Sequence, residues 1–191
     1  SGRFVDIDLE KQLNMLQVNI HSVVALTSLL LPKMLLKKEE TAILNLASIA
    51  AFQPGPYMAS YFASKAFVLS WTEGLQRELA GSNVTVTALC PPPTDTGFAR
   101  RANSGSSVAF QKGVMASPEQ VAIEAWHGLK NKKAIVLPGM FNRFAVFTQR
   151  FLPRKVVTAA AGFMNRQRSA SNQVFVRAPR ATAEIAISKA V

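Results

Sequence analysis

Tyr61 and Lys65 are the residues of this sequence whose types and spacing most directly suggest chemistry. They lie four positions apart, so on a helix their side chains share one face. A tyrosine normally titrates at about 10, and a neighbouring ammonium favours its ionised form. The pair therefore predicts a general acid or base that works near neutral pH. Tyr57 cannot form the same pair, because the residue four positions after it is Tyr61 and not a lysine.

Ser48 adds a hydroxyl group thirteen positions before Tyr61. It follows the apolar run 42–47, which is typical of a buried strand. Parallel α/β sheets place their chemistry at the carboxyl ends of the strands. The sequence thus predicts that Ser48 lies at a strand end, where the helix that carries Tyr61 and Lys65 can reach it.

The elements that must position these residues alternate between helices and strands. Gly81 is typical of the residue just after a helix, and Ser117, Pro118 and Gln120 are typical of a helix start with a capping box. Strands that alternate with helices call for parallel pairing through right-handed crossovers. We predict helices over 8–31, 57–80 and from 117, strands over 41–47, 83–90 and up to 138, loops over 53–56 and 91–116, and helical stretches over 139–165 interrupted at Pro153.

The arrangement of Ser48, Tyr61 and Lys65 resembles the catalytic core of the short-chain dehydrogenase/reductase family. Residues 16–20 resemble the family's helix with an active-site asparagine, and residues 90–98 resemble its Pro-Gly-x-x-x-Thr segment. Further along, residues 117–122 and 134–139 resemble its late helix and last strand. The resemblance implies an α/β fold, namely the C-terminal portion of a Rossmann-type doubly wound parallel sheet, with about three strands and flanking helices.

The resemblance also implies catalytic roles for Asn19, Ser48, Tyr61 and Lys65. Tyr61 would give a proton to a substrate carbonyl as hydride arrives, or take one from an alcohol. Lys65 would lower the pKa of Tyr61 and hydrogen-bond the nicotinamide ribose, and Ser48 would hydrogen-bond the substrate oxygen. Asn19 would hold a water that links Lys65 to solvent.

The cofactor implied by the resemblance is NADP or NAD, contacted by Tyr61, Lys65, Pro91, Thr94 and Thr96. An alternative for the two threonines is that they cap the following turn. The family usually has glycine where this chain has Pro92, and proline removes an N–H group at that point.

Neither the family's glycine-rich turn nor its Asn-Asn-Ala-Gly segment occurs in this chain. Ser1 to Phe4 resembles the stretch just past the fourth strand, so we expect the first half of a doubly wound domain to be lost or not included. One hypothesis is the catalytic half of an NAD(P)-dependent oxidoreductase for a carbonyl or alcohol substrate. The other is a non-catalytic remnant or an oligomerising interaction module. We expect a partial catalytic domain over 1–165 and a poorly ordered basic tail over 166–191.

Charge is concentrated in the second half of the chain. Residues 1–99 hold 7 Lys/Arg and 8 Asp/Glu, whereas residues 100–191 hold 15 and 3. No nucleic-acid motif accompanies the charge, so a solvated tail is the preferred interpretation over nucleic acid or anionic membrane. The single cysteine, Cys90, is interpreted as a core residue in a cytoplasmic protein. No residue cluster suggests a metal.

Two apolar segments bear on partners. Residues 22–36 are apolar but short, and we interpret them as a buried helix end and not as a membrane span. Residues 141–168 interleave aromatic and basic side chains, which is compatible with peripheral membrane contact, although we expect the apolar side to pack on the core. The family resemblance implies a homo-oligomer that pairs through helices 8–31 and 57–80.

Overall fold

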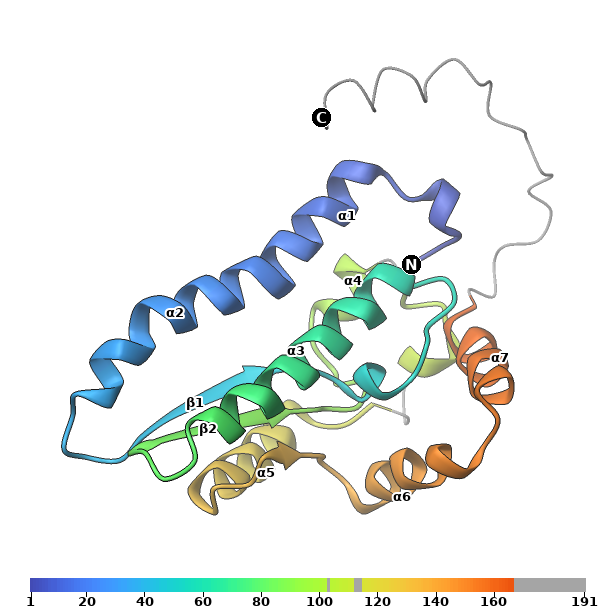
Figure 1. Cartoon of the computed structure of the whole chain (residues 1–191). Coiled ribbons are helices and arrows are strands. Elements are labelled where there is room, and N and C mark those ends of the chain that lie inside the picture. The colour runs from blue at the N-terminus through green and yellow to red at the C-terminus, as the bar shows by residue number, and fades with distance from the viewer. Residues whose placement is uncertain (103, 112–114, 167–191) are drawn as a thin grey trace.

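The computed structural model describes residues 1–102, 104–111 and 115–166, and a parallel three-stranded sheet lies at its centre (Figure 1). The strand order is β1–β2–β3, so the middle strand of the sheet is also the middle one in the chain. The strands are β1 (Thr41–Leu46), β2 (Val84–Leu89) and β3 (Ile135–Val136), and the α-helices are α1 (Leu9–Leu16), α2 (Ser22–Leu35), α3 (Ala59–Glu78), α4 (Phe98–Arg101), α5 (Pro118–Lys130), α6 (Met140–Thr148) and α7 (Arg154–Asn165).

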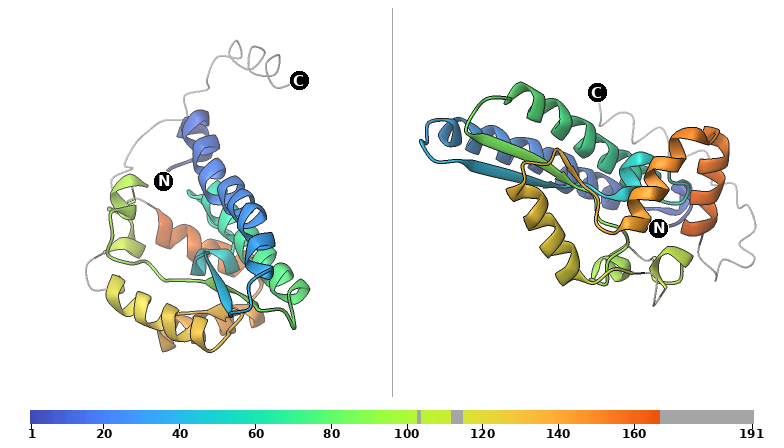
Figure 2. Two further views of the ribbon diagram at one scale, coloured as in Figure 1. Left: turned by 90° about the vertical axis from the view of Figure 1, so that its left-hand side faces the viewer. Right: turned by 90° about the horizontal axis from the view of Figure 1, so that it is seen from below.

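Helices cover both faces of β2, and Figure 2 shows α3 in green and α5 in yellow on opposite sides of the strands. Val68 of α3 packs in one buried cluster with Ala88. Val121 and Ala125 of α5 pack in another with Leu89. The strand was evident in the sequence because β2 is rich in the β-branched residues that favour strands.

The predicted α/β class and the order of elements are confirmed. Gly81 has φ +86°, the left-handed conformation that its position after α3 requires. Ser117 caps α5, because its Oγ accepts a hydrogen bond from the Gln120 backbone N–H at 3.3 Å. The predicted loop 91–116 differs in one respect, since it contains α4 and a 3₁₀ turn at Val108–Phe110.

The first helical region is longer and less regular than predicted. Asp8 caps α1 by accepting from the Lys11 N–H at 3.1 Å. A π-helical turn, Gln17–His21, joins α1 to α2. The helix then continues through Pro32 to Leu35, past the predicted end at 31. A proline interrupts one backbone hydrogen bond of a helix, and here only three helical residues follow it.

The outer side of α2 is exposed, which corrects the interpretation of 22–36 as a buried helix end. Thr27 is its only buried residue, and the Leu29 side chain is 70% exposed. Among the described residues no layer covers that side. The helical stretch Leu9–Leu35 is long and apolar enough to cross a membrane by length and composition. Core helices of soluble proteins share that property, so the absence of a membrane span stays a prediction.

Asn83 joins the end of α2 to the start of β2. Its side-chain amide donates to the carbonyl oxygens of Met34, Lys37 and Glu39 at 2.9, 3.0 and 3.2 Å. The backbone carbonyl oxygen of Asn83 accepts a hydrogen bond from the Thr41 N–H at 2.9 Å. One side chain therefore holds the α2–β1 connection against the sheet.

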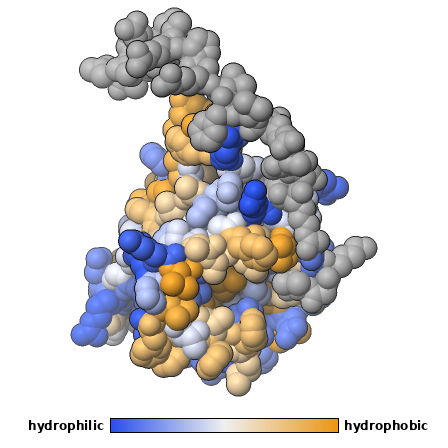
Figure 3. All heavy atoms as spheres, turned by 90° about the vertical axis from the view of Figure 1, so that its right-hand side faces the viewer, coloured by the Kyte–Doolittle hydropathy of each residue, from blue (hydrophilic) through white to orange (hydrophobic). Residues whose placement is uncertain are grey.

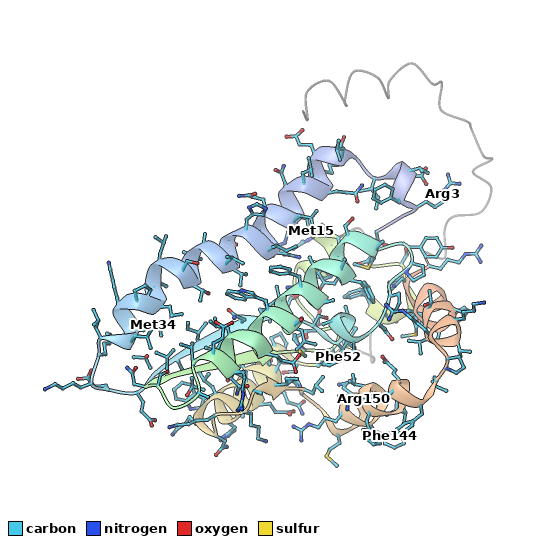
Figure 4. All side chains as sticks on the ribbon, viewed as in Figure 1. Arg3, Met15, Met34, Phe52, Phe144 and Arg150 are labelled. Carbon is cyan, nitrogen blue, oxygen red and sulfur yellow. The ribbon has the colours of Figure 1, made fainter. Side chains whose placement is uncertain are left out.

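The segment after β3 forms α6, a 3₁₀ turn at Gln149–Phe151 and α7, as the interruption at Pro153 predicted. The expected packing of its apolar side on the core is wrong for most of its large side chains. Val146 and Val157 are buried, but Phe144 is 66% exposed and points away from the sheet (Figure 4). Figure 3, which shows the side where α7 lies, has apolar colouring over much of the surface. The tail 167–191 lies outside the described residues.

The contact between α5 and β3 gives a test of this fold. A Cβ added at Gly128 would lie 2.1 Å from Val136 Cγ2. We expect Gly128→Ala to lower the free energy of unfolding by about 1–3 kcal/mol, because an extra carbon in a packed core forces neighbours to shift. Urea denaturation measures the change.

Gly74→Ala is the matched control, because nothing lies within 4 Å of a Cβ added there on α3. It should be neutral or stabilise the chain by up to about 1 kcal/mol, since alanine is the better helix former. Equal unfolding midpoints for the two variants would contradict the described packing of α5 on β3.

Candidate active site

Ser48 lies where β1 ends, as predicted. Its backbone is extended, and its Oγ accepts from the Ala50 N–H at 3.1 Å. The hydroxyl also lies 3.5 Å from the Pro91 carbonyl oxygen, to which it donates. The Ile49 N–H donates to the same oxygen at 3.1 Å. The carboxyl ends of β1 and β2 are therefore joined around Ser48.

Lys65 is hydrogen-bonded to the last residue of β1. Its side chain is almost fully buried, and its Nζ donates to the Leu46 carbonyl oxygen at 2.8 Å. Burial lowers the pKa of the Lys65 ammonium, and the nearby Cys90 opposes that change. The Nζ lies 5.8 Å from the centroid of the Tyr61 ring. The two residues thus share a face of α3, as their spacing predicted.

Tyr61 is enclosed by aromatic side chains. The Phe98 ring lies 5.1 Å from the Tyr61 ring, centroid to centroid, and the Phe62 ring lies 6.1 Å away. Burial raises the pKa of the Tyr61 phenol, and a hydrogen bond with the Ser48 side chain opposes the rise. The direction is opposite to the lowering expected from Lys65, because loss of water is the largest influence on the phenol.

Asn19 lies in the π-helical turn, a feature that composition did not predict. Such turns often occur at functional sites. Its Nδ2 donates to the Ser64 Oγ at 2.9 Å, and the Ser64 hydroxyl donates to the Tyr61 carbonyl oxygen at 2.7 Å. Asn19 is therefore joined to the helix turn that carries Tyr61. A water held between Asn19 and Lys65 stays a prediction.

Ser64 was missed by the sequence analysis. It is fully buried and connects the π-helical turn to α3. The signal available was its place directly before Lys65 on the helix face shared with Tyr61, three positions earlier. A small hydroxyl residue has many uses on a helix, so its partner could not be read from spacing.

The segment after β2 uses its hydroxyl groups locally. Thr94 Oγ1 donates to the Pro92 carbonyl oxygen at 2.8 Å. Thr96 Oγ1 accepts from the Phe98 N–H at 3.3 Å, at the start of α4. Only the Thr96 contact matches the capping alternative, because the Thr94 hydroxyl bonds a preceding residue. Cofactor contacts by Pro91, Thr94 and Thr96 stay a prediction.

Cys90 belongs to the core that α3 forms with the sheet. Burial raises the pKa of its thiol to about 12, so it is protonated at neutral pH. Within residues 1–102, 104–111 and 115–166, no group of three or more His, Cys, Asp or Glu side chains is placed to hold a metal ion.

A small apolar pocket of about 180 Å³ opens beside the Tyr61 side chain. Met58 and Phe98 line it from the α3 side and from α4. Met15 of α1 lies on the side of its helix that faces α3 (Figure 4). The pocket therefore gives Tyr61 a largely apolar environment, and Ser48 and Lys65 are not among its lining residues.

The model of the short chain dehydrogenase family matches residues 1–107, more than half of the chain. The fold and the arrangement of Ser48, Tyr61 and Lys65 agree with that match. The chain belongs to the short-chain dehydrogenase family. It is therefore of oxidoreductase ancestry.

Similar proteins include a ketoacyl reductase from Nostoc sp., 29% identical over 138 residues, which are 72% of this chain and 47% of that protein. A very-long-chain 3-oxoacyl-CoA reductase from Anas platyrhynchos is 39% identical over 90 residues, 46% of this chain and 28% of its own. A short-chain dehydrogenase from Burkholderia cenocepacia J2315, crystallised with NADP, has a TM-score of 0.68 at 25% identity, covering 84% of this chain and 63% of that one. The chain spans less than half the length of these curated relatives.

The chain has only two tyrosines, which makes the pKa of Tyr61 measurable. In a Tyr57→Phe variant, tyrosinate absorbance reports Tyr61 alone. Since burial is the largest influence, the phenol should stay protonated beyond its ordinary pKa of 10.0 and ionise only at higher pH. A spectrophotometric pH titration measures the midpoint.

The double variant Tyr57→Phe/Tyr61→Phe should lose the absorbance change entirely. A midpoint below 10.0 in the single variant would mean that Lys65, and not burial, governs the phenol.

Proposed function

We propose that this chain is the catalytic part of an NAD(P)-dependent oxidoreductase that interconverts a carbonyl and an alcohol. The observation that carries the proposal is the convergence of Ser48, Tyr61 and Lys65 at the carboxyl end of β1. The Ser48 side chain opposes the rise in the Tyr61 pKa that burial causes, and the Lys65 ammonium lies 5.8 Å from the Tyr61 ring centroid. Open α/β sheets bind their ligands at this edge.

In the direction of reduction, Tyr61 holds the proton that the carbonyl oxygen receives. The phenol holds its proton at neutral pH, and the positive charge of Lys65 would favour release of that proton as the carbonyl oxygen receives it. Ser48 donates a hydrogen bond to the same oxygen and stabilises the negative charge that develops on it. Lys65 supplies positive charge beneath the ring and so stabilises the phenolate left after proton transfer.

The residues present fit the nicotinamide end of the cofactor. Tyr61 and Lys65 of α3, with Pro91, Thr94 and Thr96 of the segment that follows β2, would hold it, since they offer hydroxyl, ammonium and carbonyl groups. NADP or NAD, when bound, supplies or accepts the hydride. The similar dehydrogenase from Burkholderia cenocepacia was crystallised with NADP. This supports the same class of cofactor here.

The printed names of the relatives support a carbonyl substrate. One is a ketoacyl reductase and the other a very-long-chain 3-oxoacyl-CoA reductase. Both reduce a ketone on an acyl chain according to those names. The apolar lining of the pocket beside Tyr61 is compatible with such a substrate.

A second candidate function is pairing with another copy of the chain. The exposed apolar side of α1 and α2 favours it, because Leu13 is 54% exposed and Leu29 70%. Contiguous exposed apolar surface marks interaction sites. A homo-oligomer is compatible with catalysis, whereas a purely structural module would leave the buried Ser48, Tyr61 and Lys65 without a role.

Tyr61→Phe tests the catalytic proposal, because it keeps the ring and removes only the hydroxyl. We expect turnover to fall about a hundredfold or more, the effect of a lost general acid. Turnover is measured with NADPH or NADH and a ketone, in a form of the protein that binds the cofactor. Ser70→Ala, which removes an exposed hydroxyl from the same helix, should leave turnover unchanged. Normal turnover in Tyr61→Phe would rule out the assignment.

The 191-residue polypeptide should bind NADPH and NADH weakly or not at all. Its sequence contains no glycine-rich turn before a helix, and such a turn is what normally holds the pyrophosphate. Isothermal titration calorimetry with both cofactors measures the affinity. Low-micromolar binding of either one would show that other residues of the chain replace the turn.

A further inference from the structure

An open groove of about 870 Å³ lies between α7 and the turn that precedes α3. It is larger than the pocket beside Tyr61, and Tyr57 is the one residue that lines both. Its volume is in the range of small-molecule sites. The lining residues are Pro56, Tyr57, Arg154, Lys155, Thr158, Ala159, Gly162, Phe163 and Arg166.

The charge of the groove has one sign. Arg154, Lys155 and Arg166 line it, all three are exposed, and none forms a salt bridge with another residue in the part of the chain that the structure describes. No acidic residue occurs anywhere in 140–166. Unpaired cations around an apolar floor attract a ligand that carries negative charge.

The position of the groove is fixed by packing between its two walls. The Asn165 Nδ2 donates to the Pro56 carbonyl oxygen at 3.1 Å, and Asn165 is buried. A Cβ added at Gly162 would lie 3.3 Å from Pro56 Cγ, so α7 approaches the turn closely. The groove is therefore a feature of packed elements.

Tyr57 connects the groove to the candidate active site. It lines both the groove and the pocket that contains Tyr61. Its φ is +67°, a conformation that costs a non-glycine residue free energy and that concentrates at ligand-binding positions. The residue that separates the two sites is thus held in a strained conformation by its surroundings.

We propose that this groove binds a phosphate or carboxylate group of the substrate, so that the enzyme acts on apolar carbonyl compounds that carry an anionic group. The cations at Arg154, Lys155 and Arg166 contact the anion. The apolar part of the ligand lies against Ala159 and Phe163 and extends past Tyr57 toward Tyr61. This assignment rests on the proposed function for the identity of the carbonyl group, but the groove itself is tested without catalysis.

The probe is octyl phosphate below its micelle concentration, titrated into the 191-residue chain by calorimetry. We expect one saturable site whose affinity falls as salt is added, because the attraction is between charges. Inorganic phosphate should bind about tenfold more weakly or worse, since it lacks the chain that the apolar floor buries. No saturable binding, or equal binding of inorganic phosphate, would overturn the proposal.

Two groove variants locate the site. Arg154→Gln/Lys155→Gln should weaken octyl phosphate binding about tenfold or more, the effect of losing charged contacts. Ala159→Trp should also abolish binding, because it fills the groove without changing its charge. The matched control is Lys37→Gln/Lys38→Gln, another adjacent pair of exposed cations far from the groove, which should change the affinity less than about twofold. Equal losses in both double variants would mean diffuse charge attraction and would overturn the site.

The Tyr61→Phe variant separates this proposal from the catalytic one. Octyl phosphate should bind it as tightly as it binds the unaltered chain, because Tyr61 does not line the groove. If binding fails in the unaltered chain while Tyr61→Phe still abolishes turnover of a neutral ketone, the groove assignment is wrong and the catalytic assignment stands. If binding succeeds and Tyr61→Phe retains full turnover, the groove assignment stands and the catalytic assignment is wrong.

Discussion

The hydrogen bond from the Lys65 ammonium to the Leu46 carbonyl oxygen positions the candidate active site of this chain. A buried ammonium is costly unless polar groups replace its water, and the last carbonyl of β1 is the group that does so. Because Lys65 belongs to α3, the bond holds that helix over the strand end. Tyr61, one turn earlier, is then brought to Ser48, two residues past Leu46. The three side chains converge because one of them needs a partner inside the protein.

The parallel pairing of β1 with β2 places a second set of groups at the same edge. Leu46 pairs with Leu89, so both strands end together. The Pro91 carbonyl oxygen then accepts from Ile49 and Ser48, and the following loop passes close to Tyr61 through Phe98. The apolar surroundings of Tyr61 and the polar contacts of Ser48 therefore both depend on β1 and β2 ending at paired residues.

Spacing along the chain was sufficient to predict which residues of β1 and α3 meet, because Ser48, Tyr61 and Lys65 lie in two consecutive elements. It was not sufficient for properties that depend on distant segments. Burial raises the pKa of Tyr61, and part of that burial comes from Phe98, whose contact with Tyr61 the spacing along the chain does not signal. The π-helical turn contains Asn19, whose hydrogen-bond partner Ser64 lies 45 positions further along the chain. An apolar stripe such as that of α6 shows which side chains share a side, but not whether anything covers them, and Phe144 is exposed.

Asn83 has a consequence for the dynamics of the chain. Its amide holds three carbonyl groups at the end of α2 and the following turn, although 44 to 49 residues separate the partners. The last turn of α2 and the start of β2 are therefore linked through the Asn83 side chain. Opening of the C-terminal end of α2 breaks its hydrogen bonds to the start of β2, and the reverse is also true. These two segments therefore behave as one cooperative unit. Amide hydrogens around Met34 and around Val84 should consequently exchange with solvent through the same opening event, despite their distance in sequence.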